Sequence, residues 1–222
     1  MNILLVGPPG AGKGTQAHIL EERYHAKHIA TGDMLRAEVT AGTPIGLEAK
    51  AVMDAGQLVS DDILIRMLGS RLAMPDCAHG MILDGFPRTV PQAEALNDLL
   101  AASGRHLDAV IVLEVDEEAL VARISGRFAC AQCGAGYHRS FHPPAVEGVC
   151  DKCGSHEFSQ RPDDTPEVVR RRLGAYRQQT APILPFYTAR GLVHRLDGMA
   201  SMDAVTDAIE TVLRHVGVAA PA

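Results

Sequence analysis

The sequence predicts an α/β fold in which helices cover both faces of a parallel β-sheet. Short apolar runs typical of buried strands alternate with longer stretches of helical periodicity along the 222 residues. The clearest run, residues 109–115, is apolar almost throughout, as in the central strands of parallel sheets. The length suits one elaborated domain that buries a sizeable core.

Composition narrows the class of protein. No apolar run approaches the roughly 18 residues that a membrane span requires. The N-terminus lacks the charged region and cleavage site of a secretory signal. A net charge of −6 argues against nucleic-acid binding through bulk positive charge. We therefore expect a soluble, cytoplasmic protein that binds neither a membrane nor nucleic acid.

The first functional motif is the glycine-rich turn between an apolar strand at residues 2–6 and a helix at 16–24. Glycines let backbone N–H groups approach an anion, the helix start adds a positive dipole end, and Lys13 adds a mobile cation. This context is typical of a phosphate-binding loop, although a glycine-rich turn without a ligand is the alternative. The predicted phosphate contacts are Gly10, Ala11, Gly12, Lys13, Gly14 and Thr15. Because the strict motif has Ser or Thr where Gly14 stands, Thr15 is a weaker candidate for Mg²⁺ than Lys13 is for phosphate.

The first half of the chain continues in the same alternation. The expected elements are a strand at 28–30, helices at 31–41, 44–55 and 61–73, a strand at 81–83 and a helix at 90–102. Thr31 or Asp33 and, further on, Ser60 are positioned to cap helices, and Gly42 separates the first two of them.

The second half contains one segment of a different kind. The expected elements are a strand at 109–115, helices at 117–126 and 165–188, a strand at 192–196 and a helix at 202–216. The long helix should bend near Pro182 and Pro185. Residues 128–160 are rich in Gly, Cys, His and Pro and show little periodicity. This segment and the helical stretch at about 31–59 are therefore expected to be insertions in the sheet domain.

A second phosphate-handling turn follows the strand at 81–83. A carboxylate at the end of such a strand, here Asp84, holds Mg²⁺ through water in P-loop enzymes. Gly85 and Pro87 shape a tight turn that aims Arg88. The alternatives are a capping role for Asp84 and a solvated loop position for Arg88.

Four of the five cysteines form two Cys-x-x-Cys pairs, Cys130 with Cys133 and Cys150 with Cys153, with sixteen residues between the pairs. This is the spacing of a four-thiolate zinc site. Because protein fills all four positions, the zinc should be structural and should supply folding energy to a segment too short for its own core. Reduced dithiols without metal, or a nearby His replacing one Cys, are the alternatives.

Several motifs together resemble the adenylate kinase family. They are Gly7 to Thr15, Thr31-Gly-Asp-Met-Leu-Arg36, Leu83-Asp-Gly-Phe-Pro-Arg88-x-x-x-Gln92, Arg123-x-x-x-Arg127 and Arg161-Pro-Asp-Asp164. The resemblance extends from Asn2 to about Val212 and is specific as a combination. It implies the reaction ATP + AMP ⇌ 2 ADP with Mg²⁺ on the phosphates, in a monomer.

The resemblance also implies a division of the chain. Residues 1–29, 60–125 and 165–222 would form the core P-loop domain, 30–59 an AMP-binding insertion, and 126–164 a lid over ATP, of the zinc-binding type. The residues implied to bind AMP are Thr31, Arg36, Gln57, Leu58, Val59, Gly85, Phe86, Pro87, Arg88, Gln92, Arg161 and Arg172. Those implied for ATP, besides the glycine-rich loop, are Arg123, Arg127, Gly136, Tyr137 and Ala200.

Phosphoryl transfer needs two polyanions held in line and their charge neutralised, and in-line positioning can lower the barrier by roughly 7–11 kcal/mol. Asp33 and Asp84 are candidates for organising the magnesium waters, and Arg123 and Arg127 should share a helix face. The cations expected to act in catalysis are Lys13, Arg88, Arg123, Arg161 and Arg172. The rival interpretations are a kinase for UMP, CMP or GMP, and a zinc-ribbon nucleic-acid-binding protein, which the acidic chain and the few basic residues at 128–160 disfavour.

Overall fold

The computed structural model describes residues 1–54, 59–160 and 164–218 and has a five-stranded, wholly parallel sheet at its centre. The strand order is β2-β3-β1-β4-β8. The strands are β1 (Asn2–Val6), β2 (Lys27–Ala30), β3 (Met81–Asp84), β4 (Ala109–Glu114) and β8 (Val193–Asp197). The α/β fold predicted from the alternation of strands and helices is confirmed.

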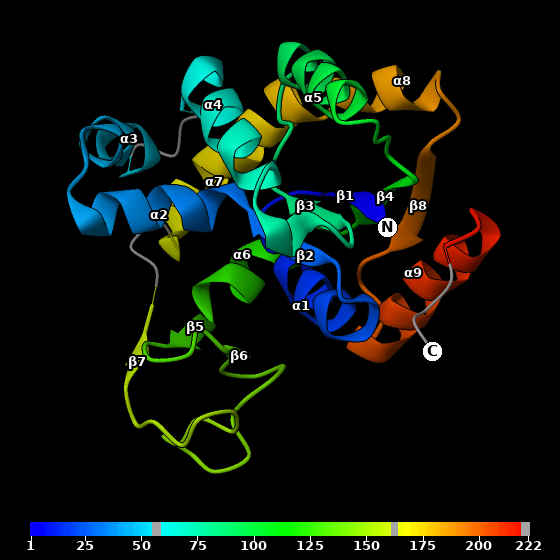
Figure 1. Cartoon of the computed structure of the whole chain (residues 1–222). Coiled ribbons are helices and arrows are strands. Elements are labelled where there is room, and N and C mark those ends of the chain that lie inside the picture. The colour runs from blue at the N-terminus through cyan, green and yellow to red at the C-terminus, as the bar shows by residue number, and fades with distance from the viewer. Residues whose placement is uncertain (55–58, 161–163, 219–222) are drawn as a thin grey trace.

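Helices cover both faces of the sheet (Figure 1). On one face α1 (Lys13–Tyr24) and α9 (Met202–His215) pack against Ile3 and Leu5 of β1. On the other face α4 (Asp61–Leu72), α5 (Val90–Ala102) and α8 (Ile183–Thr188) pack in the cluster that contains Leu4. Burial on both faces explains why the strands are apolar at nearly every position rather than at alternate ones.

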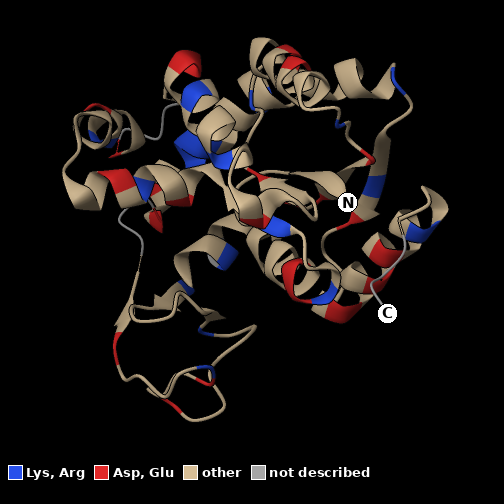
Figure 2. Ribbon diagram, in the orientation of Figure 1, with Lys and Arg blue, Asp and Glu red and all other residues tan. Residues whose placement is uncertain are grey.

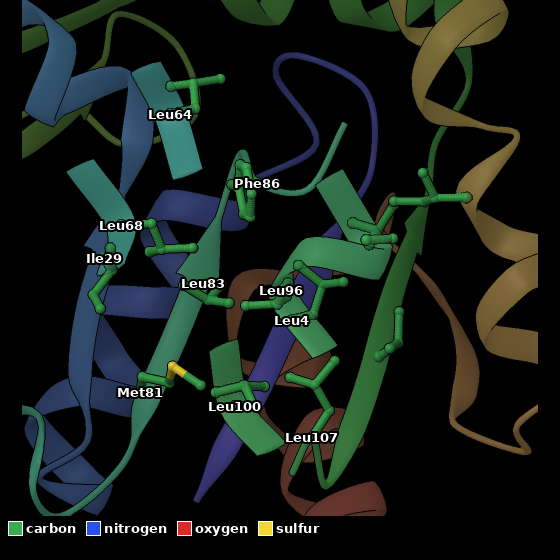
Figure 3. Close-up of a cluster of buried hydrophobic side chains, with 14 of the residues drawn as sticks. Leu4, Ile29, Leu64, Leu68, Met81, Leu83, Phe86, Leu96, Leu100 and Leu107 are labelled. Carbon is green, nitrogen blue, oxygen red and sulfur yellow. The ribbon is translucent and has the colours of Figure 1, made fainter. Parts of the chain in front are cut away.

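The second of these clusters forms the larger part of the core (Figure 3). Leu83 and Met81 of β3 point toward leucines of α5, and Phe86, just beyond β3, is fully buried in the same cluster. This packing holds the turn after β3 rigidly against the sheet.

Two helices, α2 (Thr31–Ala41) and α3 (Pro44–Asp54), form a pair that projects from the sheet (Figure 1). Gly42 ends α2 with a φ of 65°, as the break in the pattern predicted. The expected cap was wrong, because the residue that caps α2 is Ala30 and the Thr31 hydroxyl bonds elsewhere. Ser60 stands at the cap position of α4 but its side chain makes no capping hydrogen bond.

The cysteine-rich segment follows α6 (Glu117–Ser125) and contains a separate three-stranded antiparallel sheet. Its strands are β5 (Arg127–Cys130), β6 (Gly136–His138) and β7 (Phe158–Ser159). Aromatic rings of Phe128, Tyr137 and Phe158 lie 5.3–5.7 Å apart and form its small core. Strands this short leave no periodicity in a sequence, so the segment was expected to be irregular.

The helix expected at 165–188 is divided into α7 (Pro166–Ala175), a π-helical segment η3 (Tyr176–Thr180) and α8. The departure from α-helix begins at Tyr176, and a turn at Ala181 and Pro182 separates η3 from α8, so the helix is interrupted at the first of the two prolines where the bend was expected. A short 3₁₀ turn, η1 (Pro75–Cys77), lies between α4 and β3. In the described part of the chain no helix is both long and apolar enough to cross a bilayer.

Two glycines in helices should respond to the same substitution in opposite ways. A Cβ at Gly46 would lie 2.1 Å from the carbonyl oxygen of Glu38 in α2, whereas a Cβ at Gly174 in α7 meets nothing within 4 Å. We expect Gly46→Ala to lower the free energy of unfolding because α2 and α3 must separate. Gly174→Ala should raise it by about 1 kcal/mol through helix propensity. Urea unfolding of both variants checks this, and a stabilised Gly46→Ala protein would contradict the close contact.

Candidate active site

The predicted phosphate loop lies between β1 and α1 and is open on one side. Gly10 and Gly12 have φ values of 83° and 90°, a region that residues with a Cβ rarely adopt. A Cβ at Gly10 would lie 2.6 Å from Cγ1 of Ile124, so α6 packs closely beneath the loop. A Cβ at Gly12 would meet nothing within 4 Å. The backbone is thus shaped by tight packing on one side and left clear on the other.

Lys13 is the first residue of α1 and folds back over the loop. Its Nζ donates hydrogen bonds to the carbonyl oxygens of Gly7 (2.8 Å) and Pro8 (3.0 Å). Burial lowers the pKa of Lys13 to about 8; Asp84 opposes this shift, while Arg88, Arg172 and Arg127 add to it. The structure therefore brings charged residues from three separate segments, the end of β3 with its turn, β5 and α7, around Lys13.

Asp84 ends β3, the strand next to β1, and lies opposite the start of α1. A Cβ at Gly14 would lie 3.5 Å from Oδ2 of Asp84, so the residue that departs from the strict motif is the one that faces this carboxylate. Asp33, the other candidate for magnesium, forms an ion pair with Arg36 on α2. Both carboxylates act on His28, whose pKa is nevertheless lowered because burial dominates.

The turn after β3 is held by side chains from three helices. The Thr31 hydroxyl donates to the Gly85 carbonyl oxygen (2.9 Å), and so does Nε of Arg88 (2.7 Å). Gln92 is fully buried, accepts from the Arg88 backbone N–H (2.7 Å) and donates to Asp61 (2.5 Å). Four residues implied to bind AMP are thus joined by hydrogen bonds, and one of them, Thr31, is 54 residues from the turn.

Sequence reasoning missed Asp61. Its Oδ2 also accepts a hydrogen bond from the Thr89 hydroxyl (3.2 Å), so one carboxylate orients two residues at the start of α5. Its position at the start of a helix made it resemble an ordinary acidic residue of a first turn.

The arginines are held by two different partners. Arg123 donates from Nη1 to the Gly198 carbonyl oxygen (3.0 Å), which places it beside the loop that contains Ala200. Arg127 forms a bidentate pair with Asp164 (2.9 and 2.5 Å), and Nη1 of Arg172 lies 3.5 Å from the same carboxylate. Figure 2 shows basic positions on α6 and α7, the two helices that carry Arg123 and Arg172.

One expectation about this set was wrong. Arg127 does not share a helix face with Arg123, because α6 ends at Ser125 and Arg127 begins β5. Asp164, 2% exposed, was not among the predicted site residues, although it stands in the Arg161-Pro-Asp-Asp motif. Its sequence neighbours gave no signal that it would pair with Arg127, 37 residues away, as well as with Arg172.

Some predicted residues are not placed in the site. Gln57, Leu58 and Arg161 lie outside the described residues. Val59 is 7% exposed and belongs to the main core cluster. Tyr137 is buried, with its ring stacked between Phe128 and His142. A role for these residues in nucleotide binding stays a prediction.

The four cysteines predicted to bind metal form one cluster in the small sheet. Their sulfur atoms all lie within 4.8 Å of one another, with Cys130–Cys153 at 3.6 Å and Cys133–Cys150 at 3.5 Å. Tetrahedral zinc with Zn–S bonds of about 2.3 Å requires sulfur–sulfur distances of about 3.8 Å. The arrangement is therefore compatible with zinc.

The surroundings lower the pKa of two of the four thiols, Cys130 and Cys150, whereas neighbouring cysteines raise the pKa of Cys153. Backbone N–H groups of Cys133 and Gln132 lower the pKa of Cys130. The Tyr137 hydroxyl, 3.4 Å from the sulfur of Cys150, lowers the pKa of that thiol to about 6. Among the described residues no His belongs to this cluster, and the His156 ring contacts the Gly148 carbonyl oxygen instead.

The comparisons with known proteins agree with one another. The family model described as adenylate kinase matches residues 5–192. Three proteins named adenylate kinase are similar along nearly their whole length. That of Novosphingobium aromaticivorans is 61% identical over 96% of this chain and 99% of its own. That of Sphingopyxis alaskensis is 58% identical over 98% and 99%. That of Zymomonas mobilis is 56% identical over 98% and 97%.

Two aspartates that pair with arginine should contribute different amounts to the free energy of unfolding. Asp164 is 2% exposed and neutralises Arg127 and Arg172, whereas Asp76 is half exposed and pairs with Arg71 (2.7 Å). We expect Asp164→Asn to lower the free energy of unfolding by about 3 kcal/mol, because two partly buried cations lose their counter-charge. Asp76→Asn should cost less than about 1 kcal/mol. Equal losses in urea unfolding would show that Asp164 is not the counter-charge of this site.

Proposed function

The chain belongs to the adenylate kinase family, and on this premise we propose that the residues around Lys13 transfer the terminal phosphoryl group of ATP to AMP, giving two ADP. The observation that carries the assignment of the site is the convergence of Arg88, Arg127 and Arg172 on Lys13, with Asp84 facing them. A catalyst that gathers two nucleotides needs this density of positive charge, because two polyphosphates must meet at one point.

The ATP side of the site is the glycine-rich loop with Lys13, joined by Arg123, Arg127 and the loop near Ala200. The open side of the loop at Gly12 and the contact of Arg123 with Gly198 support this. A phosphate bound there would replace the Gly7 and Pro8 carbonyls as partner of the Lys13 ammonium. Backbone N–H groups at the start of α1 would bind the remaining oxygens.

The AMP side is the turn at Gly85 to Arg88 with Thr31, Arg36 and Gln92. The hydrogen bonds that join Thr31, Arg88 and Gln92 to this turn support the assignment, because they fix the direction of three side chains without any ligand. Arg88 lies at the boundary of the two sides, since it also acts on Lys13. It is therefore the residue best placed to contact the phosphoryl group in transfer.

The chemical step requires little covalent help. The AMP phosphate is already a nucleophilic anion, so no general base is needed, and the work of the protein is to align and neutralise charge. Asp84, with Asp33 as the second candidate, would hold Mg²⁺ through water; when bound with ATP this ion neutralises charge on the phosphates. The cations expected to stabilise the transition state are Lys13, Arg88, Arg123, Arg161 and Arg172.

Asp164 has a distinct role in this scheme. Its carboxylate neutralises Arg127 and Arg172 when no phosphate is present. Bound phosphates compete for the same guanidinium groups, so nucleotide binding would loosen the contact between β5 and α7. This exchange of partners links occupancy of the site to movement of the cysteine-rich segment.

The division of the chain follows from the same reasoning. Residues 30–59 would be an AMP-binding insertion and 126–164 a lid, on a core of 1–29, 60–125 and 165–222. The α2–α3 pair and the separate small sheet, both outside the parallel sheet, support it. Closure of both over the sheet edge would exclude water, which otherwise hydrolyses ATP. Every group in the scheme comes from a single chain, so a monomer is sufficient.

The metal of the lid would be structural zinc, held by Cys130, Cys133, Cys150 and Cys153. Four thiolates leave no open position for substrate, so the ion would supply folding energy and not chemistry.

The reaction is tested by a coupled assay that compares AMP with GMP, CMP and UMP as acceptors. We expect kcat/KM for AMP to exceed that for each of the others by roughly tenfold or more, which corresponds to about 1.4 kcal/mol of transition-state binding. Lys13→Met should lower kcat by roughly 100-fold or more. Lys50→Met, which removes an exposed lysine of α3 outside the proposed contacts, should leave it unchanged. No preference for AMP would refute the proposed acceptor.

The lowered pKa of Lys13 predicts proton uptake on binding. The free protein loses the Lys13 proton as pH rises through about 8, whereas an ammonium bound to phosphate keeps it. Binding of MgATP at a pH of about 9 should therefore take up a proton, and its affinity should fall as pH rises above 8. Calorimetry in two buffers of different ionisation enthalpy measures the uptake. Lys13→Arg, which stays charged, should abolish it; undiminished uptake in that variant would exclude Lys13 as the source.

The zinc assignment is tested by metal content and by Tyr137. Protein purified without chelator should contain about one zinc per chain, and less than roughly a tenth of that would contradict the assignment. Removing zinc should lower the melting temperature. Tyr137→Phe should weaken zinc binding about 10- to 100-fold, because the hydroxyl bond to the Cys150 sulfur is lost. Tyr176→Phe, in η3, is the matched control and should bind zinc normally.

A further inference from the structure

A second group of side chains that could bind a metal lies on α1 and the neighbouring strand β2, apart from the four cysteines. His18 and Glu21 of α1 and His28 of β2 each offer one ligand atom, and these atoms all lie within 4.8 Å of one another. They line a cavity of about 240 Å³ together with Lys27, Asp33 and Arg71. Neither the phosphate contacts nor the zinc-type cluster uses any of the three.

The geometry of the three residues is set by two elements. His18 and Glu21 are three apart on α1 and share one face, with Nδ1 of His18 3.8 Å from Oε2 of Glu21. The His18 and His28 rings meet edge to face, with centroids 4.8 Å apart. Donor atoms around zinc stand about 3.4 Å apart, given bonds of about 2.1 Å. A small rotation of the exposed His18 side chain would complete the site.

His28 carries a buried ring nitrogen that has no hydrogen-bond partner among the described residues. The nitrogen is Nε2, and the side chain is only 7% exposed. The closest charged atom is Oδ2 of Asp84, at 3.9 Å. A buried imidazole nitrogen without a partner is costly, and a fixed tautomer would relieve the cost. Metal ligation through Nδ1 would produce such a tautomer, with the proton on Nε2 directed at Asp84.

We propose that His18, Glu21 and His28 bind a divalent transition-metal cation of the zinc and cobalt class, with His28 joining this ion to Asp84. The site uses none of the four cysteines and no residue of the phosphate loop, and it adjoins the candidate magnesium ligand Asp84. Two imidazoles and one carboxylate leave a fourth position for water.

The charges around the cavity select the class of cation. Oε1 of Glu21 already pairs with Lys27 (2.6 Å), which leaves Oε2 for the metal. Lys27 and Arg71 place positive charge at the cavity wall, although Arg71 pairs with Asp76. Mg²⁺ and Ca²⁺, which rely on several anionic oxygens, are therefore disfavoured. Imidazole nitrogen suits zinc, cobalt and nickel instead.

The experiment uses the untagged, zinc-loaded full-length protein without nucleotide, titrated with Co²⁺. We expect one further equivalent of cobalt, with a visible spectrum that lacks the charge-transfer band of cobalt bound to thiolate. His18→Ala removes an exposed side chain and should weaken this equivalent by roughly tenfold or more. Glu21→Gln should do the same. In both variants the four-cysteine zinc should remain.

The control is His25→Asn. His25 ends α1 with a φ of 54°, a conformation that Asn tolerates, and it lies outside the cluster. This variant should bind the further cobalt as the native protein does, and cobalt should raise the melting temperature of both. Absence of a second equivalent in the native protein would overturn the proposal. Equal affinity in the native, His18→Ala and Glu21→Gln proteins would overturn it as well.

Discussion

The concentration of positive charge around Lys13 is the constraint on which the rest of the structure depends. Arg88, Arg172 and Arg127 act on Lys13 before any phosphate is present, and burial together with this repulsion lowers the pKa of the lysine. A folded chain tolerates this only if anions are built in beside the cations. Asp84 opposes the shift at Lys13, and the arginines of β5 and α7 share one buried carboxylate. These carboxylates stabilise the empty site, and its cations remain able to bind phosphate.

The parallel sheet holds the residues that carry this charge in fixed positions. β1 and β3 are neighbours in register, with Leu5 beside Asp84, so the loop after one strand meets the carboxylate at the end of the other. Both strands are buried on two faces, and Phe86 anchors the turn that follows β3. Side chains on this edge are held by packing that takes no part in binding. A site assembled at the carboxyl ends of parallel strands therefore needs little ordering when ligands arrive.

The cysteine-rich segment depends on a different source of stability. It has a core of three aromatic rings and a few neighbouring side chains, which is too small to fold by burial alone. The four cysteine sulfurs lie together beside this core, an arrangement compatible with a structural zinc that would supply the missing folding energy. Arg127 of β5 and Arg172 of α7 share the carboxylate of Asp164, and phosphates can compete for both of these guanidinium groups.

Local signals were sufficient for the fold class, the phosphate loop, the strands of the parallel sheet and the two cysteine pairs, because each depends on residues close together in the sequence. Errors arose where a local pattern competed with tertiary contacts. Thr31 bonds to the turn at Gly85 and caps nothing, and Arg127 does not share a helix face with Arg123 because α6 ends at Ser125. The nucleotide contacts assigned to Gln57, Leu58 and Arg161 stay predictions because the structure does not describe these residues.

By itself, the sequence determined which residues could bind phosphate and metal. The pairing of Asp164 with Arg127, 37 residues away, and of Asp61 with Gln92, 31 residues away, was decided only by the tertiary structure, because strand order and helix packing set which distant side chains meet.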